Sequence, residues 1–230
     1  MTVLAIDTAS RRRALCVVAG AQGEVVAAQP LPGRDLDRQL LPALAALLSD
    51  DVSAVACVLG PGSYTGLRVG IAAALGVAHA RDLPLHGIDA LDAVARTAPL
   101  DATDIEAVAD AGRGALYVAR YRREGNRFHL VEPARRVEAG EWQAVDLSAD
   151  ASGAGSSPLR HSRLERGRTP ALPLAVSLDG IPGTLDGSPR AAEALAAAAA
   201  AALAQPPLPR TGLEPVYLTG SGSVPARPRV

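Results

Sequence analysis

The residues of this chain best suited to bind a ligand form a glycine-rich turn between a strand and a helix. The turn reads Gly60-Pro61-Gly62-Ser63-Tyr64-Thr65-Gly66-Leu67-Arg68. Free N–H groups at a helix N-terminus bind phosphate when such a turn lets the anion approach. No lysine follows the glycines, however, and a single glycine-rich turn is a weak signal. A phosphate site and a purely structural connection both fit this pattern.

An apolar strand and a mostly apolar helix must position this turn. Residues 54–59 form a continuous apolar run, typical of a strand that is covered on both faces. The helix extends to Arg81, and Ser63 or Thr65 is suited to cap it. A row of small residues runs along this helix: Gly66, Gly70, Ala74 and Ala78. Because helical glycine costs about 0.8–1.0 kcal/mol relative to alanine, we expect another backbone to lie close to this row.

The composition describes an ordinary globular protein. A length of 230 residues fits two lobes of about 100 residues each. With 23 basic and 24 acidic residues the chain has no global field to attract a polyanion, which disfavours nucleic-acid binding by the chain alone. Cys16 and Cys57 lie in apolar runs and are expected to be buried thiols. Since we find neither a signal peptide nor a membrane span, we predict a cytoplasmic protein.

A helix rich in leucine is predicted from Asp35 to Leu48. Its apolar side consists of Leu36, Leu40, Leu44, Leu47 and Leu48. Pro42 should either kink this helix or make it begin near Leu41. The wide apolar stripe indicates either deep burial or surface left for a partner.

The remaining elements are shorter. Three strands at residues 3–6, 14–19 and 25–28 are predicted to form a meander or a pair of hairpins, and Gly125-Asn126 is predicted to close a hairpin between two strands of the second half. Ser188 is predicted to cap an alanine-rich helix. The four histidines show no metal-ligand spacing, and no nucleophile elbow is present, so we predict neither a metal site nor a catalytic residue in this chain.

The turn at residues 60–68 resembles the Gly-Pro-Gly-Ser-Phe/Tyr-Thr-Gly-Leu/Val-Arg signature of the TsaB (YeaZ) family of bacterial tRNA threonylcarbamoyladenosine synthesis. Residues 214–218 resemble the family's C-terminal Pro-x-Tyr-Leu-Arg strand, with Thr219 in place of arginine. Near Asp110, Gly112 and Ala115 replace the arginine and glutamate of the family. Residues 36–38 also lack the usual His-Ser-Glu-like triplet.

This resemblance implies an α/β, two-lobed actin-like ATPase (ASKHA, ribonuclease H-like) fold with a degraded second lobe. The first lobe would comprise residues 1–103 and the second residues 104–219, followed by a flexible tail at residues 220–230. Residues 150–158 are the nearest candidate for a second phosphate loop, although their composition favours a flexible loop.

The resemblance also implies a function as a non-catalytic scaffold or activator that binds a TsaD-like catalytic subunit. A TsaE-like ATPase would join the complex, tRNA would be bound only through it, and the chain in isolation would form a homodimer. The chain would hold no cofactor of its own, whereas ATP and a metal would belong to the complex or the catalytic partner. The expected interface residues are Leu36, Leu40, Leu44, Leu47, Gly70, Ala74 and Ala78. We therefore expect Gly70→Leu or Ala74→Arg to abolish the heterodimer and leave the fold intact.

Two other activities depend on particular residues of this sequence. A small ATP-dependent phosphotransferase of the actin-like superfamily would use Asp7, Thr8 and Ser10 near the nucleotide, with Asp7 facing the magnesium ion. Alternatively, Asp7 and Ser10 simply bond to backbone N–H groups in their own turn. The interpretation of this family as M22-like glycopeptidases finds no supporting residues in this sequence.

Overall fold

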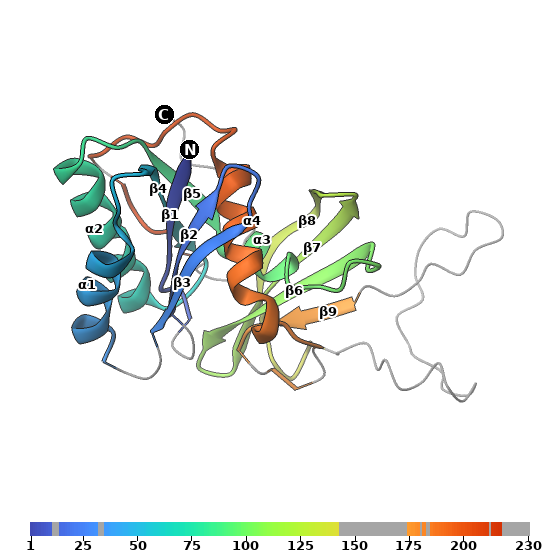
Figure 1. Ribbon diagram of the computed structural model, residues 1–230. Coiled ribbons are helices and arrows are strands. Elements are labelled where there is room, and N and C mark those ends of the chain that lie inside the picture. Colours follow the sequence, from blue (N-terminus) through green and yellow to red (C-terminus); the bar gives the residue numbers. More distant parts are fainter. Residues whose placement is uncertain are drawn as a thin grey trace, which may run out of the picture.

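The computed structural model describes residues 1–10, 14–31, 35–142, 174–179, 181–182, 185–211 and 213–217. Two five-stranded mixed sheets form its framework (Figure 1). The first sheet has the order β3-β2-β1-β4-β5 and consists of β1 (Thr2–Asp7), β2 (Ala14–Gly20), β3 (Val25–Leu31), β4 (Val52–Gly60) and β5 (Leu85–Asp89). The second has the order β10-β9-β6-β7-β8 and consists of β6 (Asp104–Gly112), β7 (Ala115–Glu124), β8 (Arg127–Glu138), β9 (Leu174–Ser177) and β10 (Leu185–Asp186).

The two sheets repeat one topology. In the first sheet, β1 pairs antiparallel with β2 and parallel with β4. In the second sheet, β6 pairs antiparallel with β7 and parallel with β9. Read from the hairpin side, the order β3-β2-β1-β4-β5 corresponds to β8-β7-β6-β9-β10. This repetition agrees with the predicted two-lobed α/β fold.

In the part of the chain that the structure describes, four α-helices complete the layers. The helices α1 (Leu36–Leu47) and α2 (Tyr64–Ala80) cover one face of the first sheet (Figure 1). Helix α4 (Ala191–Ala202) covers the opposite face, where its alanines lie close to β1 and β2. Helix α3 (Ala90–Ala95) packs against α4 and also against the second sheet. The first sheet is therefore enclosed between two helical layers.

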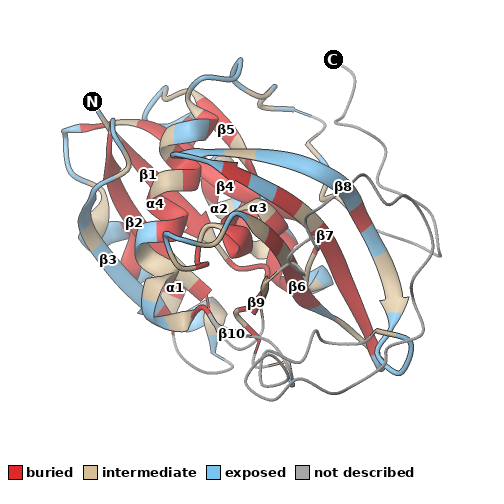
Figure 2. Cartoon of the chain, turned by 90° about the vertical axis from the view of Figure 1, so that its right-hand side faces the viewer, coloured by how far each residue is buried: buried red, intermediate tan, exposed pale blue. Residues whose placement is uncertain are grey.

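Burial follows this layering. Figure 2 shows that β1 and β4 are buried, whereas the outer strands β3 and β8 are largely exposed. Cys16 and Cys57 are buried free thiols, as the sequence predicts, and burial raises the pKa of each to about 12. Within the part of the chain that the structure describes, no helix is long and apolar enough to cross a membrane.

The last described segment returns to the first lobe. Leu208 N donates to Leu85 O at 2.7 Å, and Val216 N donates to Leu59 O at 2.8 Å. Helix α4 likewise packs on the first sheet, although it follows the second sheet in sequence. The predicted division at residue 103 lies between the two sheets. After it, β9 and β10 belong to the second sheet, whereas α4 and the last described segment pack on the first.

Several local predictions need correction. Helix α1 begins at Leu36 and runs through Pro42, so it does not start near Leu41. Ser188 does not cap α4, since Ser188–Arg190 form a short 3-10 turn (η2) and α4 begins without a side-chain cap. Residues 213–217 form no strand; they run along the surface of the first lobe as an irregular segment. The predicted loop at residues 150–158 and the tail at residues 220–230 lie outside the described residues.

Candidate functional site

The glycine-rich turn joins β4 to α2 in a geometry that its residue types explain. Gly60 has φ +127°, a conformation that side chains disfavour, and a Cβ there would lie 2.5 Å from Val216 O. Ser63 caps α2, because its Oγ accepts a hydrogen bond from Gly66 N at 3.3 Å. The capping prediction for Ser63 is confirmed, while Thr65 is exposed on the first turn of the helix.

The start of α2 lies directly on the turn that follows β1. Ser63 N donates to Ala9 O at 2.7 Å, and Thr8 Oγ1 donates to Gly66 O at 2.7 Å. A Cβ at Gly66 would lie 2.0 Å from Thr8 O, and one at Gly62 would lie 2.6 Å from Ala9 O. The close backbone that the small-residue row predicts is therefore the chain's own. These contacts favour the structural interpretation of the turn over the phosphate interpretation.

The same geometry corrects part of the predicted partner interface. A Cβ at Gly70 would meet Thr8 Oγ1 at 2.1 Å, so this glycine faces the interior of the lobe. Ala74 and Ala78 are also fully buried, in the core beneath α1 and α2. Gly70→Leu or Ala74→Arg would consequently damage the fold itself. These three residues therefore belong to the core, on the side of α2 that also buries Leu67 and Ile71.

The leucines of α1 divide in a similar way. Leu40 and Leu44 are buried against the first sheet, and Leu36 and Leu47 are half-buried at the edge of the same cluster. Leu41 is 67% exposed on the outer side of the helix. The predicted stripe thus serves mainly the chain's own core, and Leu41 is the large apolar side chain that α1 presents outward.

The outer face of α2 carries three small residues and one arginine. Thr65, Arg68, Ala72 and Gly76 are all exposed and follow one another at a spacing of three or four residues. A Cβ at Gly76 would meet no atom within 4 Å among the described residues. Gly70 therefore has a packing reason within this chain, whereas for Gly76 the described part of the chain supplies none.

Asp7 and Ser10 make contacts in and beyond their turn. Asp7 Oδ1 accepts from Ala9 N at 2.8 Å, the turn bond that the structural interpretation predicts. Ser10 Oγ donates to the carboxylate of Asp179, whose other oxygen accepts from Asp110 N at 3.0 Å. The turn after β1 is thereby attached to the second lobe. Thr8 is buried beneath α2, so the three residues predicted near a nucleotide take part in packing and in contacts between lobes.

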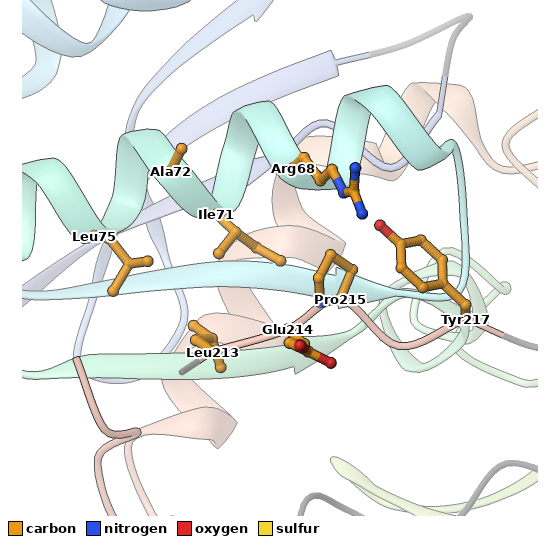
Figure 3. A pocket seen from close by; sticks show the side chains of 8 residues that line it. All are labelled: Arg68, Ile71, Ala72, Leu75, Leu213, Glu214, Pro215 and Tyr217. Atoms are coloured by element: carbon orange, nitrogen blue, oxygen red, sulfur yellow. The ribbon is translucent and has the colours of Figure 1, made fainter. Parts of the chain in front are cut away.

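Tyr64 and Arg68 of the signature form a stacked group with the last described segment. The Arg68 guanidinium lies 3.8 Å from the centre of the Tyr64 ring, and the Tyr64 and Tyr217 rings stack with centroids 5.2 Å apart. Beside this stack lies a hollow of about 370 Å³ between α2 and residues 213–217 (Figure 3). It is lined by Arg68, Ile71, Ala72, Leu75, Leu213, Glu214, Pro215 and Tyr217.

Sequence reasoning did not find this contact between the signature and the C-terminal segment. The likeness of residues 214–218 to a family strand drew attention to Tyr217, but nothing in the sequence pairs that tyrosine with Tyr64. Nor do the described residues bring three His, Cys, Asp or Glu side chains together as metal ligands.

Comparisons with known proteins agree with this geometry. The family model for TsaD, tRNA N6-adenosine threonylcarbamoyltransferase, matches residues 34–148, half of the chain. The tRNA threonylcarbamoyladenosine biosynthesis protein TsaB of Escherichia coli is 33% identical over 165 residues, which cover 63% of this chain and 71% of the relative. TsaB of Bacillus subtilis is 28% identical over 150 residues, which cover 62% of this chain and 64% of the relative.

A solved structure extends the likeness to nearly the whole chain. YeaZ from Pseudomonas aeruginosa superposes with a TM-score of 0.63 at 21% sequence identity, covering 94% of this chain and 99% of that structure. With the repeated sheet topology, this match confirms the actin-like (ASKHA) fold. The signature turn, the duplicated lobes and the identity to E. coli TsaB lead to one conclusion: the chain belongs to the TsaB (YeaZ) family.

Proposed function

We propose that this chain is a non-catalytic scaffold subunit that binds and activates a TsaD-like catalytic subunit. Membership of the TsaB family links the chain to tRNA threonylcarbamoyladenosine biosynthesis. In this role the chain holds the catalytic subunit in its active form while that subunit, with metal and ATP, modifies the tRNA. A TsaE-like ATPase joins the same complex, and tRNA is bound by the assembled complex.

The observation that carries this proposal is the exposed Gly76, inside α2 and one turn before its C-terminal end. Glycine inside a helix costs about 0.8–1.0 kcal/mol relative to alanine. At Gly70 the contact with Thr8 offsets that cost, but at Gly76 no described atom lies near enough to do so. A partner helix that packs closely on α2 would explain why position 76 is glycine. The separation of packed helices depends on the side chains at their contact, so a residue without a side chain lets the two backbones approach.

The neighbouring exposed residues suit such a contact. Ala72 and Thr65 are small, and they lie on the same side of α2 as Gly76. Leu41 of α1, 67% exposed, adds a large apolar side chain to this outer helical layer. Interfaces gain most of their energy from a few well-buried anchors, and Leu41 is suited to be one. The same surface supports a homodimer when the catalytic subunit is absent.

The start of α2 gives independent support to a scaffold. Two of its backbone N–H groups already have acceptors within the chain, since Ser63 N donates to Ala9 O and Gly66 N donates to the Ser63 side chain. A small ATP-dependent phosphotransferase would need such N–H groups for phosphate. The geometry of this turn therefore favours the scaffold over the phosphotransferase.

Co-purification of the chain with the TsaD-like subunit of its own source tests the proposed surface. We expect Ala72→Arg to abolish the complex, since a long cation would stand between the two helices. Ala28→Arg is the matched control, because Ala28 is exposed on the edge strand β3, where Ala27 and not Ala28 packs against the core beneath α1 and α2. Both variants should keep the circular dichroism of the wild type. Wild-type binding by Ala72→Arg would rule out this face as the interface.

A further inference from the structure

The chain passes from the first lobe to the second between α3 and β6, and two arginines, Arg123 buried and Arg190 half-buried, hold this hinge. Arg123 of β7 is 8% exposed and donates to Ala98 O at 3.1 Å and also to Pro99 O. Arg190, just before α4, donates to the same Ala98 oxygen. Two cations from distant parts of the sequence thus meet on adjacent carbonyls of the hinge.

Neighbouring groups complete the environment of these cations. The guanidinium groups of Arg96 and Arg123 each lie 4.7 Å from the centre of the Phe128 ring. Burial, followed by the nearby charges of Arg190 and Arg96, lowers the pKa of Arg123. A buried cation that lost these carbonyl acceptors would lose its hydrogen bonds and keep only the contact with the Phe128 ring. Moving the hinge away from Arg123 is therefore strongly unfavourable.

The backbone before α4 also lies on the hinge. A Cβ at Gly187 would lie 2.1 Å from Thr97 Oγ1, and Thr97 is 1% exposed. Gly187 N in turn donates to Ser177 O of β9 at 2.9 Å. Residues from β7 and from the segment just before α4 therefore contact the short segment at residues 97–99, and β9 holds Gly187 in place.

A second set of contacts joins the lobes at the turn after β1. Ser10 Oγ donates to Asp179, which is 8% exposed and which also accepts from Asp110 N. Asp179 N donates to Ser177 Oγ at 3.0 Å, which fixes the loop that carries this carboxylate. The first lobe is thus attached to the second both at the hinge and through the turn after β1.

We propose that the arginine clamp (Arg123 and Arg190 on Ala98 and Pro99) and the Ser10–Asp179 tie lock the two lobes in one fixed arrangement. The chain then undergoes no opening and closing of its lobes around a ligand. This property goes beyond the proposed function, because it belongs to the isolated chain and does not depend on any partner.

Pulsed electron spin resonance between the lobes tests the lock. Spin labels are attached at Val26→Cys on β3 and His129→Cys on β8, both exposed, in the two lobes (Figure 1). Cys16 and Cys57 are buried, with pKa values of about 12, so they react poorly with the label. We expect one narrow distance distribution that does not change when Mg-ATP is added. A broad or two-peaked distribution in the wild type would overturn the proposal.

Variants of the clamp make the test specific. Arg123→Met with Arg190→Met should broaden the distribution, whereas the control Arg122→Met should not, because Arg122 is 54% exposed and pairs with Asp104 on the adjacent strand. If the double variant does not fold, Arg190→Met and Asp179→Asn, each alone, carry the test and should also broaden the distribution. Clamp variants that fold and stay as narrow as the wild type would refute the lock.

Discussion

Two glycines in one helix should respond in opposite ways to the same substitution. Gly70 and Gly76 both lie inside α2, six positions apart, but Gly70 faces Thr8, whereas none of the described residues lies against Gly76. We predict that Gly70→Ala destabilises the protein and that Gly76→Ala stabilises it. The pair separates the effect of helix propensity, which is shared, from the effect of packing, which differs.

The expected magnitudes follow from the contacts. Alanine at position 70 gains about 0.8–1.0 kcal/mol of helix propensity. It also brings a methyl group to 2.1 Å from Thr8 Oγ1, and overpacking of a core typically costs about 1–3 kcal/mol. Displacing Thr8 weakens its bond to Gly66 O, a further loss of about 0.5–1.5 kcal/mol. We expect Gly70→Ala to lower the free energy of unfolding by about 1–3 kcal/mol.

Thermal unfolding provides the assay. In a protein of this size 1 kcal/mol corresponds to about 2–4 °C in Tm, so Gly70→Ala should lower Tm by about 2–12 °C and Gly76→Ala should raise it by about 2–4 °C. Adding Thr8→Ala should reduce the effect of Gly70→Ala, because the atom that collides is then removed. If Gly70→Ala is as stable as Gly76→Ala, the assignment of Gly70 to the core is wrong.

Three further predictions concern the same lobe and the hinge. Ser63→Ala removes the cap of α2 and should reduce the free energy of unfolding, measured by urea denaturation, by about 1 kcal/mol. Ser63→Gly should reduce it by only a few tenths of a kcal/mol, and equal losses in the two variants would argue against the cap. Gly187→Val should destabilise the protein through its collision with Thr97 in the same assay, and an unchanged midpoint would contradict the close approach. Burial raises the pKa of Cys57 from 9.0 to about 12, so the protonated thiol contributes its full stability below pH 9.0 and loses it as the pH rises toward 12. In Cys57→Ala, this part of the fall in the free energy of unfolding at alkaline pH should disappear.

Much of the fold could be predicted because the residues that decide it are neighbours in sequence. The apolar runs of β1, β2 and β4 predict buried strands by themselves, and Ser63 lies three residues before the N–H group that it caps. The Gly125-Asn126 turn likewise joins β7 and β8 as predicted.

The direction of the small-residue row could not be predicted in the same way. Sequence shows that glycine and alanine recur along α2, but which side faces the sheet depends on how the helix docks on Thr8. The C-terminal segment presented a similar difficulty, since Tyr217 stacks on a ring 153 positions earlier in the chain. Arg123 and Arg190 converge on one carbonyl from separate elements, and no local pattern marks such a meeting.

The most direct test of the central claim is a tRNA threonylcarbamoylation assay with the TsaD-like subunit of the same source, with and without this chain. The scaffold account predicts that activity depends on the added chain, that Ala72→Arg fails to support it, and that the chain alone modifies no tRNA. Full activity of the catalytic subunit without this chain, or undiminished activation by Ala72→Arg despite a native fold, would contradict the account.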